Sequence, residues 1–256
     1  MKKQTVLYYK GHDFMNVKDK RVLVTGGAVR IGRAICLAFA RAGSLIVIHY
    51  NRSGRAAAEL LDEIGGEAAG HRKVQCELST LNAAKKIFAE AGPIDILINN
   101  ASVYNEKSIS EESPEDAKRQ FEINFKAPFE LMKQLYASEI QEGCIINILD
   151  QRINKISASA GSYALSKKVL ADAGMASAIQ WAPRIRVNAI APGPVLPPVG
   201  MENSRMEKTL KSVPMAKAVS MDDLTDACLF LAGNNSITGQ ILYVDGGQHL
   251  HRVTID

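Results

Sequence analysis

A tyrosine and a lysine four residues apart carry the clearest chemical potential in this sequence. Tyr163 and Lys167 begin and end the run YALSK, and on a helix this spacing places both side chains on one face. A phenol with its ordinary pKa of about 10 transfers protons poorly near neutral pH. Because a nearby ammonium favours the phenolate, we expect Lys167 to lower the pKa of Tyr163 and make it an effective proton donor.

The same spacing is common on solvated helix faces, so its specificity comes from the polar groups expected around it. In an open parallel sheet, ligands bind beyond the carboxyl ends of the strands. Several polar or small residues stand at or beside such expected ends, and one more stands on a helix. They are Asn100, Ala101, Ser102, Asp150, Pro192 and Gly193, with Asn124 on the helix.

Asp150, thirteen residues before Tyr163, narrows the chemistry. In ketone reduction an oxygen gains negative charge, which a neighbouring carboxylate would repel. Imine reduction protonates a nitrogen and forms no oxyanion, so a carboxylate bonded to Tyr163 can relay protons and accept substrate N–H groups. We therefore expect Asp150 to be catalytic; a strand-end cap or an ion pair with Arg152 is the alternative.

The elements that would position these residues follow a regular alternation. Short β-branched runs are expected as strands at 22–25, 45–50, 73–76, 94–99, 144–149, 185–190 and 240–244. Longer amphipathic stretches are expected as helices at 30–42, 55–64, 81–91, 116–137, 162–181 and 221–232. The alternation predicts an α/β fold: a single Rossmann-type doubly wound domain with a seven-stranded parallel sheet and helices on both faces.

A glycine-rich turn, TGGAVRIG at residues 25–32, joins the first strand to the first helix. Gly26 permits the tight turn, Gly32 permits close helix packing, and the helix N-terminus near Ile31 offers N–H groups to a pyrophosphate. Arg30 replaces the middle glycine of many such turns. It can neutralise a phosphate or contact a substrate acceptor, or it can be an ordinary solvated arginine.

The end of the second strand indicates which dinucleotide is bound. NAD-specific domains usually place an acidic residue there to hold the ribose 2′-hydroxyl. Instead the sequence has Tyr50, Asn51, Arg52 and Ser53, whose donors suit a 2′-phosphate, so we expect NADP(H). Ser53 could equally cap the next helix. Glu77 and Leu78 follow the third strand and are expected near the adenine, with a surface acid as the alternative for Glu77.

Composition limits the remaining classes. The 256 residues are 46% hydrophobic and 23% charged with a net charge of +4, too mild and dispersed to favour nucleic acid. No apolar run has the length of a membrane span and no secretory leader is evident. The cysteines are scattered, which favours buried reduced thiols in a cytoplasmic protein; they are Cys36, Cys76, Cys144 and Cys228.

No metal site is expected. The histidines considered as ligands lack acids at ligand spacing and are expected at the surface or in the C-terminal tail. They are His12, His71, His249 and His251.

Two segments stand apart from the periodic pattern. Residues 1–14 show none of it, so they are an N-terminal extension, possibly disordered, or Met15 is the true initiator, with a single domain over 15–256. Residues 191–214 are rich in proline. They are expected to cross the mouth of the site, either as a mobile substrate loop, with 195–205 shaping the pocket, or as a rigid surface connection.

Over residues 17–249 the sequence resembles the short-chain dehydrogenase/reductase family. The glycine turn, the NNA segment, Asn124, the YxxxK pair, Pro192-Gly193 and the ending YVDGG match in order and spacing. The resemblance implies that Tyr163 donates the proton, that Lys167 also holds the nicotinamide ribose, and that Asn124 belongs to a proton relay. It also implies a homotetramer acting on a small molecule.

Departures from the family pattern point to one branch. The family's usual serine is Asp150 and its usual threonine is Pro197; Arg30 and the segments NNAS and HYNRS also depart. These features resemble the pteridine reductase and dihydromonapterin reductase branch, which reduces C=N bonds with NADPH. By resemblance the pterin site would include Arg30, Ser102, Tyr104, Asp150 and Tyr163, with Tyr104 stacking on the ring.

Two alternative functions stay open at this point. The first is an NADP(H)-dependent carbonyl or 3-oxoacyl thioester reductase in which Asp150 is a tolerated variation. The second is an NADP-sensing regulatory protein that keeps the fold without the chemistry. Intact Tyr163, Lys167 and Asn124 speak against a sensor, because a sensor needs no proton relay.

Overall fold

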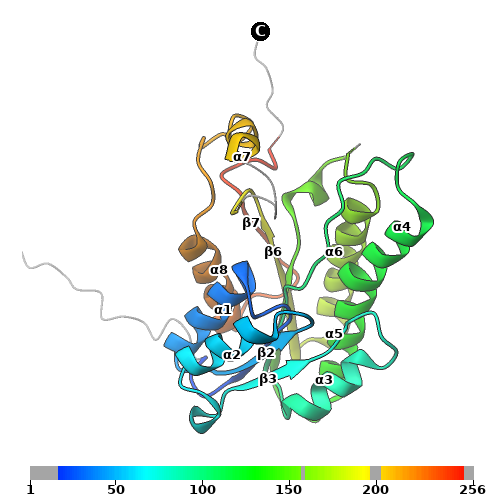
Figure 1. The fold of residues 1–256 in the computed structure, drawn as a ribbon. Helices are drawn as coiled ribbons and strands as arrows, with labels where there is room; N and C mark the ends of the chain where they lie inside the picture. The colour runs from blue at the N-terminus through cyan, green and yellow to red at the C-terminus, as the bar shows by residue number, and fades with distance from the viewer. Residues whose placement is uncertain (1–16, 157–158, 197–202, 251–256) are drawn as a thin grey trace, which may run out of the picture.

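Seven parallel strands form one sheet in the order β3-β2-β1-β4-β5-β6-β7 (Figure 1). The computed structural model describes residues 17–156, 159–196 and 203–250. The strands are β1 (Arg21–Val24), β2 (Leu45–Tyr50), β3 (Arg72–Gln75), β4 (Ile96–Asn99), β5 (Gly143–Ile148), β6 (Ile185–Pro192) and β7 (Ile241–Val244). The predicted seven-stranded parallel sheet is confirmed, with each strand within two residues of its expected limits. The expected extension over 1–14 and Pro197 lie outside the described residues.

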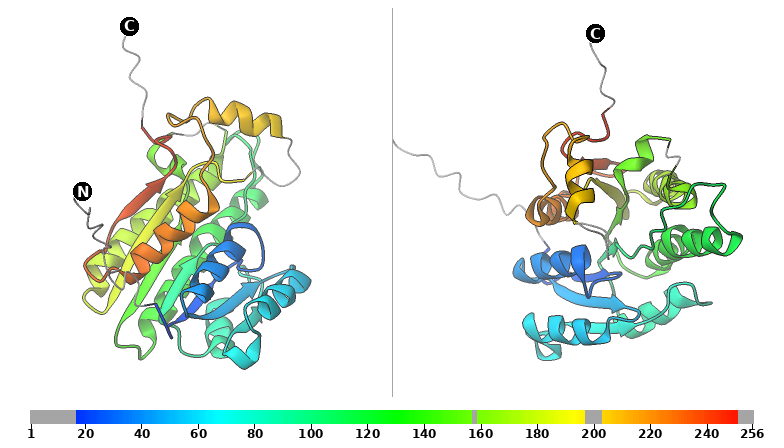
Figure 2. Two further views of the ribbon diagram at one scale, coloured as in Figure 1. Left: turned by 90° about the vertical axis from the view of Figure 1, so that its left-hand side faces the viewer. Right: turned by 45° about the horizontal axis from the view of Figure 1, so that its top comes forward.

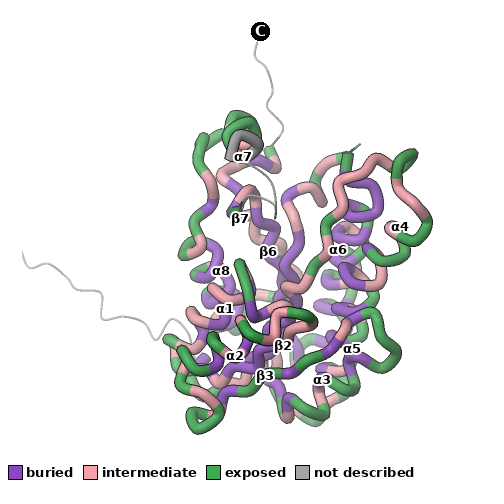
Figure 3. The backbone as a smooth tube through the Cα atoms, viewed as in Figure 1, coloured by how far each residue is buried: buried purple, intermediate pink, exposed green. Residues whose placement is uncertain are grey.

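Helices cover both faces of the sheet (Figures 1 and 2). On one face lie α1 (Arg30–Arg41), α2 (Gly54–Glu63) and α8 (Met221–Gly233), and on the other α3 (Ala83–Ala91), α5 (Ala127–Ala137) and α6 (Gly161–Trp181). Within β1, Val22 and Val24 pack on the first face and Leu23 on the second. Burial on both faces explains why the strands are almost uniformly apolar, and Figure 3 shows the buried residues gathered along them.

The chain order reverses between β1 and β4. From β1 the chain builds outward through β2 and β3, then returns to place β4 beside β1. Thr25 ties the two strand ends together, because its Oγ1 accepts from the backbone N–H groups of Asn100 at 2.9 Å and Ala101 at 3.0 Å. This reversal opens the crevice in which α/β sheets bind ligands.

The long helix expected over 116–137 is interrupted. The chain forms α4 (Pro114–Phe121), then a π-helical turn η2 (Glu122–Lys126), then α5. Pro128 has no N–H to donate to the carbonyl of Asn124, so the regular α-helical ladder cannot run through this point. The interruption falls on Asn124 itself, and π-turns of this kind are frequent at functional sites.

The segment 191–214, expected to cross the mouth of the site as a mobile loop or a rigid connection, contains regular structure. β6 extends to Pro192, and a helix, α7 (Asn203–Leu210), lies within the segment. The prolines and glycines on its N-terminal side hid a short helical pattern of two turns. Residues 197–202 are outside the described part of the chain, so the choice between a mobile loop and a rigid connection stays open there.

His71 departs from its expected surface position, and His249 departs from the expected lack of a neighbouring acid. His71 is buried, and its Nδ1 accepts from the N–H of Ile46 at 3.0 Å. His249 Nδ1 lies 2.9 Å from Oδ2 of Asp245, four residues earlier, so an acid does stand nearby. The four cysteines are buried and free, as predicted.

Within the described ranges no group of three or more metal-binding side chains occurs. No helix in the same ranges is long and apolar enough to span a bilayer. His12 and His251 lie outside those ranges. The expected cytoplasmic location stays a prediction.

Gly32→Ala is expected to destabilise the fold at the glycine turn. A Cβ on Gly32 would lie 2.1 Å from the carbonyl oxygen of Gly26 and 2.7 Å from Nδ2 of Asn100, so backbone must shift. We expect the free energy of unfolding in urea to fall by about 1–3 kcal/mol. Gly54→Ala is the control, because its Cβ would only touch Tyr50 at 3.5 Å. Equal unfolding midpoints for the two variants would contradict this account.

Candidate active site

A cavity of about 470 Å³ opens beyond the carboxyl ends of the central strands. Its walls come from the β1–α1 turn, the segment after β4, the ends of β5 and β6, and α6. It brings together ten of the residues predicted from the sequence: Arg30, Ile31, Asn100, Ser102, Tyr104, Asp150, Tyr163, Lys167, Pro192 and Gly193. Every residue expected at the substrate therefore lines one cavity.

Tyr163 and Asp150 meet directly inside it. The Tyr163 hydroxyl donates to Oδ2 of Asp150 at 3.0 Å. Asp150 also accepts from the backbone N–H of Arg152 through Oδ1 at 2.8 Å and from the Arg152 guanidinium through Oδ2 at 2.9 Å. The contact with Tyr163 and the alternative of a capping ion pair are thus both present, because one carboxylate serves all three partners.

The expectation that Lys167 lowers the pKa of Tyr163 below its ordinary value is wrong in this structure. Burial, followed by the Asp150 carboxylate, raises the pKa of Tyr163 well above its ordinary value. Burial lowers the pKa of Lys167 to about 8, and its ammonium donates to the carbonyl oxygen of Ile148 at 2.8 Å. Removing the phenol from water changes its pKa more than a nearby lysine charge does, and the four-residue spacing carries no signal of that burial.

Asn124 lies beneath the cavity, where the π-turn η2 holds it. Its Oδ1 accepts from the Ser102 hydroxyl at 3.0 Å and the Val103 N–H at 2.8 Å. Its Nδ2 donates to the Val103 carbonyl at 2.9 Å and to Ser166 Oγ at 3.3 Å. Asn124 is buried and reaches the cavity through Ser102, a bonding pattern consistent with the relay role that the resemblance implies.

Tyr104 stands at the cavity edge and contacts Tyr163. Their ring centroids lie 4.8 Å apart with the planes at 81°, an edge-to-face arrangement. The guanidinium carbon of Arg152 lies 5.6 Å from the centroid of the Tyr104 ring. The sequence indicates Arg152 only as a possible ion-pair partner of Asp150. Its packing on Tyr104 had no signal in the sequence, because the two residues are 48 positions apart.

A second cavity, of about 190 Å³, lies on the other side of the glycine turn. Five predicted cofactor residues line it, and these are Gly26, Tyr50, Asn51, Arg52 and Ser53. Asn51 donates to the carboxylate of Glu77, which explains how Glu77 borders this region. Arg119, from α4, also lines the cavity. Sequence reasoning missed Arg119, because only the fold brings α4 across to the end of β2.

The glycine turn is tightly packed. Gly26 donates to Nδ1 of the buried His49 at 3.2 Å, and burial lowers the pKa of that imidazole to about 4, which keeps it neutral. Arg30 has a positive φ of 53°, which explains why glycine is usual at this position. Where a Cβ on Gly32 would meet backbone at 2.1 Å, only glycine leaves room. Such a cradle fits a dinucleotide pyrophosphate.

Four predicted cofactor residues line neither cavity, and one of them is Glu77, which is linked to the smaller cavity only through Asn51. Gly32 lies under the turn, Ala101 bonds through its N–H to Thr25, and Leu78 is buried in the core between β3 and α3. Their expected roles in cofactor binding stay predictions. Ala101 and Gly32 would contribute through the conformation of the backbone at the turn.

Comparisons with known proteins agree with this arrangement. The family model described as enoyl-(acyl carrier protein) reductase matches residues 27–249. The chain belongs to the short-chain dehydrogenase/reductase family. It is 33% identical to 2-dehydro-3-deoxy-D-gluconate 5-dehydrogenase of Formosa agariphila, over 92% of this chain and 94% of that one. It is 29% identical to the 3-oxoacyl-[acyl-carrier-protein] reductase FabG of Chlamydia muridarum, over 90% and 97%.

A solved structure is more similar than either of these relatives. FolM alternative dihydrofolate reductase 1 from Brucella canis, complexed with NADP, shares 37% identity with a TM-score of 0.84. The match covers 94% of this chain and 98% of that one. The NADP in that structure agrees with the cofactor expected here from residues 50–53.

Arg52→Ala is expected to weaken NADPH binding and leave NADH binding unchanged. Losing a charge-assisted contact to a phosphate costs about 1.5–3 kcal/mol, which is roughly a ten- to hundredfold rise in Kd. Arg119→Ala should act in the same direction. Titration of nicotinamide fluorescence measures both cofactors. Arg55→Ala is the control, because Arg55 is exposed and pairs with Glu59. Equal weakening of NADPH and NADH would contradict a phosphate contact.

Proposed function

We propose that this protein is an NADPH-dependent reductase that reduces a C=N bond of a pterin or dihydropterin. The observation that carries the proposal is the 3.0 Å hydrogen bond from Tyr163 to Asp150 at the wall of the cavity. A neutral phenol paired with a carboxylate is suited to protonate a nitrogen. It is poorly suited to stabilise an oxyanion.

The residues around the glycine turn fit the cofactor. The second cavity offers Arg52 and Ser53 to a 2′-phosphate, the close cradle at Gly32 suits the pyrophosphate, and the buried Lys167 suits the nicotinamide ribose. When bound, the reduced nicotinamide supplies the hydride for the substrate carbon. The protein itself must then orient the substrate and deliver one proton to its nitrogen.

Tyr163 is the proton donor in this mechanism. Its raised pKa keeps the phenol protonated across the neutral range, so the proton to be delivered is in place before reaction. Asp150 accepts N–H groups of the substrate and bonds to the Tyr163 hydroxyl, which holds that hydroxyl in position. Ser102 and Asn124 connect the cavity to the buried hydrogen bonds that can resupply a proton.

The pocket shape supports a planar substrate. Tyr104 stands at the edge of the cavity with its ring against Tyr163, and Arg30 lines the opposite turn. A flat heterocycle would be held between Tyr104 and the nicotinamide, with its donors toward Asp150. The Brucella structure, described as an alternative dihydrofolate reductase, supports a related substrate class.

A carbonyl or 3-oxoacyl thioester reductase is the second candidate. It is favoured by the Formosa dehydrogenase and the Chlamydia FabG enzyme, whose names describe oxidation or reduction at carbon–oxygen centres. For such an enzyme, Asp150 would be a tolerated replacement of the family's usual serine beside a developing oxyanion. A regulatory NADP sensor is disfavoured, because it would gain nothing from the Tyr163–Asp150 bond.

NADPH oxidation separates the two enzymatic candidates. Dihydrobiopterin or dihydromonapterin should be reduced, and acetoacetyl thioesters should not. Tyr163→Phe and Asp150→Ser should each lower kcat with the pterin by about 10²–10⁴-fold, the usual range for a lost proton-transfer group. Tyr136→Phe is the control, because Tyr136 is partly exposed on α5 and does not line the cavity. Full turnover in either site variant, or preference for the thioester, would reject the proposed function.

We also propose that the protein is a homotetramer, as the family resemblance implies. Exposed apolar side chains recur along one side of α6 at Leu165, Val169 and Ile179, with Asp172 among them, and Ile179 is 84% exposed. An apolar helix face of this kind is stabilised by burial against another chain. Light scattering should give four chains per particle, and Ile179→Glu should reduce that number. Leu81→Glu, at another exposed leucine, should not; a wild-type monomer would end this proposal.

A further inference from the structure

We propose that Arg152 is a positioning residue that fixes the Asp150 carboxylate on Tyr163 and balances its negative charge. The inference rests on the proposed function for the identity of the substrate only. The contacts that support it lie within the protein. Arg152 follows β5 in the 3₁₀ turn η3 (Gln151–Asn154), at the wall of the main cavity.

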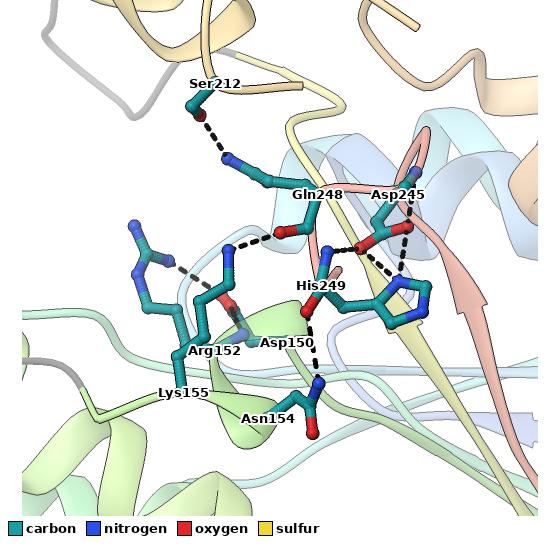
Figure 4. Close-up of polar contacts among 9 residues, drawn as sticks. Asp150, Arg152, Asn154, Lys155, Ser212, Asp245, Gln248 and His249 are labelled. Atoms are coloured by element: carbon teal, nitrogen blue, oxygen red, sulfur yellow. Dashed lines mark hydrogen bonds and ion pairs between the residues drawn. The ribbon is translucent and has the colours of Figure 1, made fainter. Parts of the chain in front are cut away.

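Arg152 contacts both oxygens of Asp150. Its backbone N–H reaches Oδ1 at 2.8 Å, and its guanidinium Nη1 reaches Oδ2 at 2.9 Å. Oδ2 is also the atom that accepts from the Tyr163 hydroxyl at 3.0 Å. With one oxygen held by the turn and the other by the side chain, the carboxylate has little freedom to rotate. Figure 4 shows the Arg152 side chain directed at Asp150.

A fourth side chain closes the cluster. The guanidinium carbon of Arg152 lies 5.6 Å from the centroid of the Tyr104 ring, and Tyr104 lies edge-to-face on Tyr163. The Asp150 side chain is 16% exposed and that of Arg152 is 35% exposed. Partial burial strengthens the ion pair relative to one in water and holds the four groups in one geometry.

Arg152, rather than Lys167, forms the direct ion pair with Asp150, although the Lys167 charge also interacts with that carboxylate. The Lys167 ammonium donates to the Ile148 carbonyl, whereas Arg152 forms an ion pair with Asp150. Arg152 also acts to lower the pKa of Tyr163, against the larger effects of burial and Asp150. Without Arg152, the Asp150 carboxylate would raise the pKa of Tyr163 further and make proton transfer from the phenol harder. Asp150 and Arg152 therefore work as a pair, and each needs the other.

The rest of η3 has a different task, which provides a matched control. Asn154 donates to the carbonyl of His249 at 3.1 Å, and Lys155 donates to the carbonyl of Gln248. Figure 4 shows both side chains directed at the C-terminal segment and away from Asp150. Asn154→Ala therefore loosens the same turn without touching the cluster.

The test is a double-mutant cycle between Asp150 and Arg152. If Arg152 acts through the carboxylate, it becomes dispensable once the carboxylate is removed. Arg152→Gln should lower kcat by about tenfold or more in the wild-type background and by less than about twofold in the Asp150→Ser background. Arg152→Lys should recover part of the loss. The Kd for NADPH should stay unchanged, and Asn154→Ala should keep wild-type kcat.

Three results would overturn the inference. The first is an equal loss of kcat from Arg152→Gln in both backgrounds, and the second is a parallel loss in Asn154→Ala. The third is a fall in NADPH affinity together with kcat, which would mean a general disturbance of the site. The cycle is run on whichever substrate the wild type reduces. Reduction of carbonyl compounds alone would end the pterin proposal and still leave the Asp150–Arg152 coupling to be measured.

Discussion

The hydrogen bond between the Tyr163 hydroxyl and Asp150 is the interaction on which the proposed chemistry depends. It places a negative charge beside a phenol that burial already makes a weak acid. Two changes in free energy therefore act on the same proton, and both keep it on the tyrosine. Under the proposed function, such a site keeps its proton until a substrate nitrogen accepts it, which is the reverse of a site that stabilises a developing oxyanion.

The fold makes this bond by bringing together the end of one strand and the start of a helix. Asp150 follows β5, and Tyr163 lies in the first turn of α6, so the two side chains meet where the chain turns back over the sheet. The 3₁₀ turn η3 lies between them in the sequence and is capped by Asp150 itself. The carboxylate thus has a structural task and a chemical one, which ties the geometry of the turn to the geometry of the site.

Sequence reasoning succeeded where a property is local and failed where it depends on distant packing. The alternation of apolar strands and amphipathic helices was sufficient to predict the sheet. The order of motifs was sufficient to predict ten residues that line one cavity. The π-turn at Asn124 was not predicted, because the helical periodicity of the sequence continues through Pro128 even though this proline interrupts the hydrogen bonds of the helix. Arg119 was missed because its neighbour Arg52 is 67 positions away. The pKa of Tyr163 was misjudged because burial cannot be read from a four-residue spacing.

The charge pattern along the two cavities explains how one crevice can serve an anionic cofactor and a cationic or neutral substrate. The glycine turn borders both, with Gly26 in the smaller cavity and Arg30 in the larger. Arg52 and Arg119 give the smaller cavity a positive end suited to a phosphate. At the opposite end Arg152 neutralises Asp150 within an ion pair. A carboxylate left without that partner would repel the phosphates that share the crevice. The pairing therefore lets an acidic residue stand in a site whose other charges attract anions.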